Sequence, residues 1–491
     1  MRLPGFWQDR ITLGTYGPFF RLPLAIPPHA MRSHFHVMGL TGSGKSRFLA
    51  SLYLQLIDHG LSATLVDPAG DLARLILTHL VASGRYRDPK FFERIIYLDL
   101  PLAERRGRFM PFNVLRQRLS PHAVSANVVE AMHRAWPALA EGVAPMFDTL
   151  VQNGVKVLLS NFVPLPQLYR FLTDQHFRDV LLANEQDADV VSVFRDWYDK
   201  LSPKDQLDMS GSTLRRVNLL TFDPVLKYSL GQSRNVLHFR DILDGNRSVI
   251  INLSLGNHDA RRLFGSLLTV NAEQGALSRA DLPPDQRHGS HHLILDEFSE
   301  FSAQSEEALA RMLSLTRKYG LFVVMAHQTW SQASERLKGA VQNAGIEVAF
   351  GLGRPDAEYS ARLVGHVNPD EVKHEVHDEG AMERTHPVFY SLPEQWELWT
   401  HTLYNLHPQQ AIIVDRPHRR WRRFLHQPVR RVTKIKALPV PDPRVDPHLL
   451  TEVEEEYLRR YFVARSDIEE ELEHYRRFGA VPATTRTRPI R

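Results

Sequence analysis

The sequence predicts an α/β protein that has a mostly parallel, doubly wound sheet and an all-helical domain inserted into it. Three observations lead to this prediction. Short apolar runs alternate with helical segments in two parts of the chain, a long helical stretch lies between these parts, and a glycine-rich loop joins the first predicted strand to the first predicted helix. Alternating strands and helices form parallel sheets with helices on both faces.

The first group of strands begins near residue 34. His34–Met38 is a short apolar run, and after the glycine-rich loop the residues Leu49, Leu52, Tyr53 and Leu56 recur at the spacing of one helix face. Two further apolar runs predict strands at Ala63–Val66 and Ile95–Leu98. The beginning of the chain therefore has the strand–loop–helix order of a parallel sheet.

The alternation stops after these strands and resumes much later. Residues 117–236 have mostly helical patterns, and strand-type runs return at 248–253, 293–295, 321–325, 346–350 and 411–414. We therefore predict a β-rich or extended lead-in at 1–30, an α/β domain split between 31–116 and 237–415, a helical insertion at 117–236, and a basic linker with a charged helical tail at 416–491.

The composition is that of a folded protein with an ordinary core. Of the 491 residues, 43% are hydrophobic and 24% are charged, which excludes a globally disordered chain. The net charge of +4 fits an anionic partner without requiring one. Cysteine is absent, so disulfides and thiolate chemistry are excluded. We find no apolar run of about 18 residues and expect no membrane-spanning helix.

Residues 39–46 read GLTGSGKS and match the phosphate-binding pattern G-x-x-x-x-G-K-S (Walker A). In this pattern the backbone N–H groups surround the phosphates, Lys45 reaches the β- and γ-phosphates, and the Ser46 hydroxyl binds Mg²⁺. The loop follows an apolar strand and opens an amphipathic helix, which is the context that this chemistry requires. We therefore expect bound ATP and Mg²⁺, with the nucleotide held by Gly39, Thr41, Gly42, Ser43, Gly44, Lys45 and Ser46.

Two later strands end in polar residues at the same predicted edge of the sheet. The run Leu293–Leu295 ends in Asp296 and Glu297, and another apolar run leads to Gln328. Asp296 can hold Mg²⁺ through water, Glu297 can polarise the attacking water as a general base, and Gln328 can sense the γ-phosphate or orient the water. Alone, such residues are typical of solvated strand ends, but the glycine-rich loop on the same sheet favours the catalytic interpretation.

Three arginines are candidates for a cation that stabilises the γ-phosphate of a neighbouring subunit. Arg317 precedes the strand that leads to Gln328, and Arg354 and Arg362 follow the next strand. Each of the three is equally compatible with an ordinary surface arginine. The residues alone leave this choice open.

Two other groups of polar residues have weaker signals. His288, His291 and His292, and also His374 and His377, lack the spacing of a zinc motif, so we interpret both groups as solvated loops. The basic run 416–436 has Trp421 and Phe424 between arginines, which suits phosphate contact and base stacking. It is equally compatible with a solvated tail or with a segment that docks on an acidic face. Its candidate DNA contacts are Arg419, Arg420, Arg422 and Arg423.

The motifs GLTGSGKS, VDPAGDL, LILDEF, RKYGL and AHQ, in this order, resemble the HerA/FtsK superfamily of hexameric DNA-pumping ATPases. The closest resemblance is to the conjugative coupling proteins of the TraD and TraG type and their soluble relatives, over about residues 31–415. It implies a RecA-like core, a ring of six subunits with ATP between neighbours, and a relaxase, secretion channel or nuclease as partner. It also implies a cytoplasmic protein, which partners could hold at the inner face of the membrane.

The resemblance also assigns roles to residues. Lys45, Ser46, Asp296, Glu297 and Gln328 take the nucleotide roles described above, and Arg317 matches the arginine that reaches the neighbouring subunit. The chain departs from the family in two features. It lacks the N-terminal spanning helices of membrane-bound coupling proteins, and Gly351 rather than an arginine follows Phe350.

Together these features predict an ATPase that moves DNA through a ring. One alternative is a secretion ATPase that acts on protein substrates or pilus assembly, because it shares every ATP motif. A second is a HerA-like motor that works with a nuclease. A third is a scaffold that binds ATP without hydrolysis, against which the intact pair Asp296 and Glu297 argues. The sequence does not distinguish conjugation, mobile-element transfer, repair and defence.

Overall fold

The computed structural model describes residues 10–17, 21–117, 119–136, 139, 146–284, 287, 289–302, 306–330, 338–339, 341, 343–365, 367–368, 370–378, 384–415 and 431–478. The chain forms two compact units, each built from segments that are far apart in the sequence. Unit 1 comprises Met1–Leu61, Ile294–Glu297 and Phe322–Pro441, and unit 2 comprises Ser62–Leu293, Phe298–Leu321 and Asp442–Arg491. The predicted boundaries of the four domains stay a prediction.

Unit 1 is built on a sheet that combines antiparallel and parallel strands. Its strands are neighbours in the order β2 (Leu22–Ile26), β1 (Ile11–Tyr16), β14 (Arg431–Ala437), β13 (Gln410–Asp415), β10 (Ile346–Ala349), β3 (Phe35–Met38) and β9 (Leu321–His327). Strands β10, β3 and β9 are parallel and buried along their whole length, whereas β13, β14, β1 and β2 are antiparallel. Strands buried on both faces read as continuous apolar runs, which is why the sequence revealed them.

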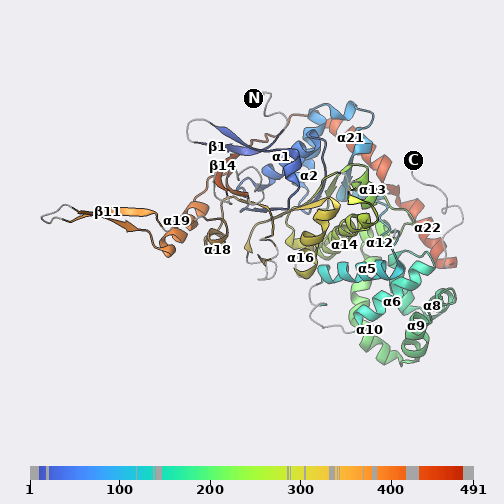
Figure 1. Cartoon of the computed structure of the whole chain (residues 1–491). Helices are drawn as coiled ribbons and strands as arrows, with labels where there is room; N and C mark the ends of the chain where they lie inside the picture. Colours follow the sequence, from blue (N-terminus) through green and yellow to red (C-terminus); the bar gives the residue numbers. More distant parts are fainter. Residues whose placement is uncertain are drawn as a thin grey trace. The chain divides into compact units, whose positions relative to one another are not determined.

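The helices of unit 1 include α1, α18 and α19, which Figure 1 labels. Helix α1 (Lys45–Asp58) begins in the glycine-rich loop and buries Leu49, Leu52, Tyr53 and Leu56, as its periodicity predicts. Helices α18 (Arg354–Val364) and α19 (Leu392–Tyr404) pack against each other, and the chain between them forms the hairpin of β11 (Val372–Asp378) and β12 (Arg384–Phe389). The hairpin strands pair only with each other among the described residues.

Unit 2 contains a second group of parallel strands, β4 (Ser62–Asp67), β7 (Ser248–Asn252) and β5 (Ile95–Asp99), in that order. Strand β8 (His291–Leu295) begins in unit 2 and ends in unit 1. Helices α2 (Asp71–Ala82) and α14 (His258–Leu277) belong to the same unit. The predicted class, a largely parallel sheet with helices and a helical insertion, is confirmed by these elements.

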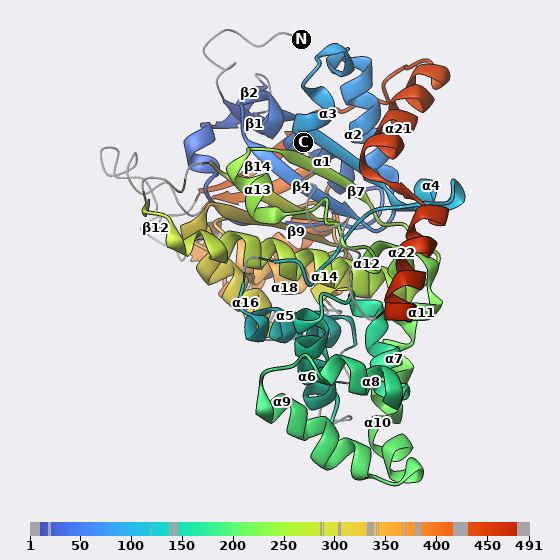
Figure 2. The ribbon, with the colours of Figure 1, turned by 90° about the vertical axis from the view of Figure 1, so that its right-hand side faces the viewer.

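The long helical stretch between β5 and β7 is drawn in Figure 2. It comprises α5 (Pro121–Ala135), α6 (Phe147–Ser160), α7 (Leu168–Thr173), α8 (Gln175–Leu182), α9 (Ala188–Ser192), α10 (Pro203–Val217), α11 (Leu219–Phe222) and α12 (Pro224–Leu230). Helix α5 packs against both α6 and α14. In the described part of the chain, no helix is both long and apolar enough to span a membrane.

The C-terminal helices α21 (Pro447–Tyr461) and α22 (Arg465–Phe478) belong to unit 2 and pack against its other elements. The Tyr457 hydroxyl donates to the Ile95 carbonyl over 2.8 Å, and a Glu471 oxygen accepts from the Ser233 N–H over 2.7 Å. The fully buried Tyr475 ring adds apolar contact, and burial raises the pKa of its hydroxyl. Each of these helices, although rich in charged residues, therefore has one buried face.

Two interpretations of polar segments are wrong. The part of the basic run that the structure describes, from Arg431, is strand β14 between β13 and β1, not a solvated tail.

His291 and His292 are buried in β8 rather than solvated, and the hydroxyls of Ser62 and Thr64 lie 2.9 and 2.8 Å from the two His291 ring nitrogens. Burial lowers the pKa of His291 to about 3, so its ring is neutral. His374 and His377 lie on strand β11 instead of in a loop, and His288 lies outside the described residues.

A buried charge cluster joins three helices of unit 2. Glu273 on α14 is 0% exposed, and its carboxylate accepts from Arg134 on α5 over 2.9 Å and from Arg311 on α16 (Glu306–Leu315) over 3.2 Å. Arg134, which is 1% exposed, also donates to Glu130 over 3.0 Å. An arginine stays charged in a protein, so its burial is costly unless carboxylates offset the lost hydration.

We predict that Glu273→Ala destabilises unit 2 by about 3 kcal/mol, because it leaves Arg134 buried with one carboxylate instead of two. The melting temperature measures this loss. The matched control is Glu456→Ala, which removes the mostly exposed pairs with Arg459 and Arg460 and should cost less than about 1 kcal/mol. Equal shifts in the two variants would contradict the role of the cluster.

Candidate nucleotide site

Backbone hydrogen bonds hold the start of the glycine-rich loop at the ends of two strands. The Gly39 N–H donates to the His327 carbonyl over 3.3 Å, and the Leu40 N–H donates to the Gly351 carbonyl over 3.0 Å. A Cβ on Gly39 would lie 2.5 Å from Ser43 Oγ and 2.7 Å from Phe350 Cβ. Only glycine fits at residue 39, so the first glycine of the motif is required by packing.

The end of the loop is held by a residue that sequence analysis missed. Gly44 has a φ of +112° at the start of α1, and a Cβ there would lie 3.1 Å from the backbone of Gln409. The Gln409 N–H donates to the Ser43 carbonyl over 2.8 Å, and Gln409 itself has a left-handed φ of +68°. Nothing in the local sequence reveals this contact, because it joins residues far apart in the chain.

The predicted charged residues meet beside this loop. Lys45 is 5% exposed, its Nζ lies 3.7 Å from Asp296 Oδ1, and it forms a hydrogen bond to Glu297 Oε1. Asp296 and Glu297 follow directly after β8. The structure thus brings together one cation and two carboxylates from distant segments, all within unit 1.

Gln328 extends this cluster from the end of β9. Its Nε2 donates to Glu297 Oε1 over 2.9 Å, and its Oε1 accepts from the Thr41 hydroxyl over 3.0 Å. A side-chain amide can donate and accept at once, so Gln328 connects the carboxylate to the loop. Four of the predicted site residues therefore form one continuous hydrogen-bonded chain: Lys45, Glu297, Gln328 and Thr41.

Glu297 has an unusual backbone conformation. Its φ is +49°, in the left-handed region that residues other than glycine seldom occupy. Such strain is typical of functional sites, where surrounding contacts hold it in place. Here the contacts are those of the Glu297 carboxylate with Lys45 and Gln328.

The groups around the loop suit a magnesium-bound triphosphate. Ser43 Oγ is buried without a hydrogen-bond partner among the residues that the structure describes, and the Ser46 side chain is accessible. Asp296 is nearly buried beside Lys45. A lysine, a free hydroxyl, loop N–H groups and a carboxylate are the groups expected to bind phosphates and Mg²⁺.

The candidate arginines lie elsewhere. Arg317 is exposed on a short 3-10 helix, Thr316–Tyr319, in unit 2. Arg354 and Arg362 are exposed on α18, and Arg354 donates to Glu358 and Glu397 over 3.1 and 2.8 Å. The candidate DNA-contacting arginines at 419, 420, 422 and 423 lie outside the described residues.

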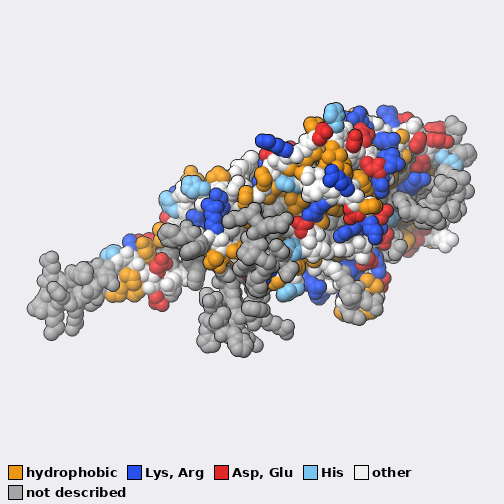
Figure 3. All heavy atoms as spheres, turned by 90° about the horizontal axis from the view of Figure 1, so that it is seen from above, with side chains coloured by type: hydrophobic (Ala, Val, Ile, Leu, Met, Phe, Trp, Pro, Cys, Tyr) orange, Lys and Arg blue, Asp and Glu red, His pale blue; other side chains and the backbone are white. Residues whose placement is uncertain are grey.

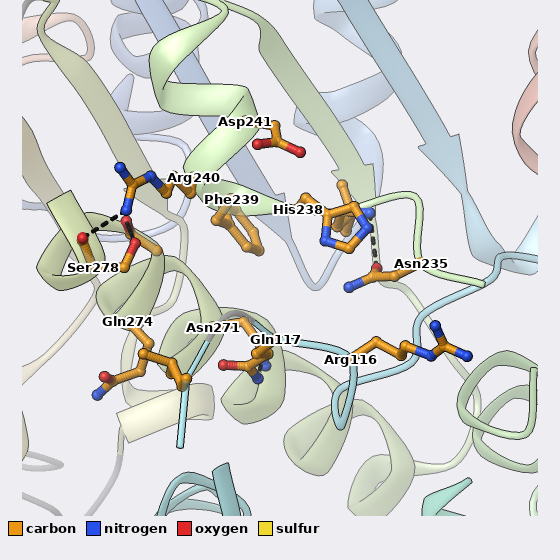
Figure 4. Close-up of a pocket in the computed structure, with 13 residues that line it drawn as sticks. Arg116, Gln117, Asn235, His238, Phe239, Arg240, Asp241, Asn271, Gln274 and Ser278 are labelled. Atoms are coloured by element: carbon orange, nitrogen blue, oxygen red, sulfur yellow. Dashed lines mark hydrogen bonds between the residues drawn. The ribbon is translucent and has the colours of Figure 1, made fainter. Parts of the chain in front are cut away.

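A separate cavity of about 60 Å³ lies in unit 2 (Figure 4). Its lining includes Gln117, Asn271 and Arg240, and none of the predicted site residues. Gln117 donates to Asn271 over 2.7 Å, and Arg240 donates to the Ser278 carbonyl over 2.7 Å. The lining groups thus bind one another, and the cavity has room for only a few water molecules.

The chain is similar to several known proteins. Residues 290–388 match the family model described as the TraM recognition site of TraD and TraG. The plasmid coupling protein TrwB, solved with a non-hydrolysable GTP analogue, aligns with a TM-score of 0.56 and 19% identity over 86% of this chain and 90% of that chain. TrwB solved with ADP and Mg²⁺ gives a TM-score of 0.53 and 16% identity, covering 86% and 89% of the two chains.

A second solved protein has a comparable fold. VirB4 of Thermoanaerobacter pseudethanolicus aligns with a TM-score of 0.54 and 12% identity over 91% of this chain and 99% of that chain. No curated protein matches the sequence. At these identities the structural likeness establishes the fold alone. The family match adds a likeness in sequence, which is confined to residues 290–388. The resemblance expected from the motifs is therefore confirmed: the chain has the fold of the coupling protein TrwB and carries, at residues 290–388, a segment of the TraD and TraG type.

Proposed function

We propose that this protein is a motor ATPase of the coupling-protein type that hydrolyses ATP at subunit interfaces and moves DNA through a ring. The observation that carries the proposal is the hydrogen-bonded chain of Lys45, Glu297, Gln328 and Thr41 around a glycine-rich loop. The match of residues 290–388 to the TraD and TraG family supports the assignment to DNA transfer.

In the proposed reaction, Lys45 binds the β- and γ-phosphates and therefore exchanges its contact with Glu297 for one with the nucleotide. Ser46 and Asp296 would hold Mg²⁺, which would supply positive charge to the phosphates. Glu297, still bonded to Gln328, then polarises the attacking water. The contact between Lys45 and Glu297 balances both charges until the nucleotide replaces it.

The proposed assembly is a homohexamer with Arg317 as the cation that reaches a neighbour's γ-phosphate, and Arg354 and Arg362 as rivals. Arg317 fits because its side chain is exposed, whereas Arg354 already binds two glutamates. The DNA-contacting residues proposed from the sequence are Arg419, Arg420, Arg422 and Arg423.

We also propose a protein partner of the kind named in the family description, a TraM-like protein of the DNA-processing machinery, with a relaxase, nuclease or secretion channel as other partners. Apolar side chains are exposed on the hairpin strands and α19, namely Val372, Phe389, Leu392, Leu398 and Tyr404. Figure 3 shows that hydrophobic side chains also reach the surface elsewhere on the face that it displays. Exposed apolar groups of this kind suit protein contact. Such partners would hold the protein in the cytoplasm or at the inner face of the membrane.

The roles of Lys45 and Glu297 predict different defects. Lys45→Ala should weaken ATP binding about 10- to 100-fold, because a charge-assisted hydrogen bond contributes about 1.5–3 kcal/mol. Glu297→Gln should bind ATP at least as tightly as the natural protein, since the closer of the two carboxylates that compete for Lys45 becomes a neutral amide. It should hydrolyse ATP about 10²- to 10⁴-fold more slowly. Calorimetric binding and single-turnover hydrolysis separate the two effects. Normal hydrolysis by Glu297→Gln would exclude the general-base role.

The proposed substrate predicts that DNA stimulates the ATPase. Replacing Arg419, Arg420, Arg422 and Arg423 by alanine should weaken DNA binding and flatten its dependence on salt, by about 0.7–0.9 in the log–log slope for each phosphate that the protein no longer neutralises. The matched control replaces four exposed cations of unit 2, namely Arg87, Lys90, Arg94 and Arg105. It should leave the slope unchanged. Equal effects of the two sets would show that only net charge matters.

The likeness to VirB4, which covers 99% of that chain, favours one second candidate, an ATPase that drives protein secretion. It shares the same ATP site. The discriminating measurement is the ATPase rate with and without DNA at low salt, with Lys45→Ala as the blank. Absence of both DNA binding and stimulation would favour the secretion ATPase.

A further inference from the structure

Two buried histidines lie side by side behind the glycine-rich loop. His36 is on β3 and His327 is the last residue of β9, and their Nε2 atoms are 2.7 Å apart. The rings are stacked, with centroids 5.0 Å apart. Both side chains are almost fully buried. The mechanism described above uses neither residue.

The direction of the hydrogen bond between them follows from their surroundings. His327 Nδ1 lies 3.0 Å from the Thr329 carbonyl, which can only accept, so this nitrogen carries a proton. Burial lowers the pKa of His327 to about 4, so its ring is neutral and its Nε2 has no proton. His36 Nε2 must therefore donate to His327 Nε2. His327 is thus held in one tautomer, with its proton on Nδ1.

These bonds fix the segment that contains Gln328. The His327 carbonyl accepts from Gly39, and the His327 ring donates to Thr329, on the other side of Gln328. Gln328 is thus held between two anchored residues. Its amide then has the orientation that serves both Glu297 and Thr41.

Trp330 completes the arrangement. Its ring contacts both histidines, with centroids 5.0 Å from each. Its backbone N–H donates to Asp356 over 3.0 Å, and its indole N–H donates to Ser360 over 2.9 Å, both on α18. The segment from His327 to Trp330 is therefore tied to β3 at one end and to α18 at the other.

We propose that His36, His327 and Trp330 form a positioning cluster that holds Gln328 against Glu297 and Thr41 during hydrolysis. The proposal rests on the proposed ATPase function. His36 is a positioning residue in it, because it acts on Gln328 through its hydrogen bond and ring contact with His327. A misplacement of about 1 Å at a reacting group can lower a rate about 100-fold, so such a cluster has a measurable effect.

The test compares His36→Leu with His36→Gln. Leucine leaves the buried His327 Nε2 without a donor, so the ring and the Gln328 segment shift. We expect kcat for ATP hydrolysis to fall about 10- to 100-fold, with ATP affinity unchanged within about twofold. Glutamine retains an N–H donor at a similar reach and should restore most of kcat.

A matched control separates positioning from general destabilisation. His34 also lies buried beside β9, where its Nδ1 accepts from the Val323 N–H over 2.9 Å. His34→Leu removes this bond farther along β9 from Gln328. It should lower the melting temperature about as much as His36→Leu but leave kcat within about twofold. Equal losses of kcat in both variants would overturn the proposal.

The decisive readout is the effect of His36→Leu in a Gln328→Ala background. If the cluster acts through Gln328, the second change should not lower kcat further, because residues that act as a unit have non-additive effects. A multiplied loss would overturn the proposal. Absence of hydrolysis by the natural protein would overturn the ATPase function as well. Hydrolysis that Lys45→Ala abolishes and His36→Leu leaves at full rate would overturn only the cluster.

Discussion

The whole site depends on how the glycine-rich loop is fixed at the sheet edge. Strand β3 lies between β9 and β10, and the loop that follows it is bonded to the ends of both neighbours, through Gly39 to His327 and through Leu40 to Gly351. Parallel strands place their carboxyl ends at one edge, where ligands of such folds bind. Because the loop is anchored there, Lys45 reaches carboxylates that are over 250 residues away in the sequence.

The elements with local signals could be predicted from the sequence. The buried parallel strands are continuous apolar runs, and the loop 39–46 has a spacing that few other structures require. Strand β14 also had a signal, because in its TKIKA segment the buried Ile435 and Ala437 alternate with the more accessible Lys434 and Lys436. The many arginines before this segment favour the interpretation as a basic tail. They concealed the alternation of apolar and polar residues that is typical of a strand.

The remaining features depend on contacts that no local pattern encodes. Gln409 supports Gly44 only because the turn before β13 lies against the loop, and His36 meets His327 across a separation of 291 residues. The sequence favours a solvated loop for His291 because its group of histidines lacks the spacing of a zinc motif. His291 is buried because two hydroxyls satisfy both of its ring nitrogens. Pairing of this kind can be recognised only after the strands are assembled.

The cluster beside the loop also explains how a carboxylate can stay close to phosphates. Lys45 faces both Asp296 and Glu297, so the local charge is negative before any nucleotide binds. In the proposed reaction, the triphosphate binds Lys45 in place of Glu297, and its negative charge would repel the Glu297 carboxylate. Gln328 opposes this repulsion, because its neutral amide donates to Glu297 while its oxygen is held by Thr41 of the loop itself. The strained backbone of Glu297 further limits its retreat. In the proposed reaction, Glu297 can therefore stay in place as the general base only while Gln328 holds its carboxylate.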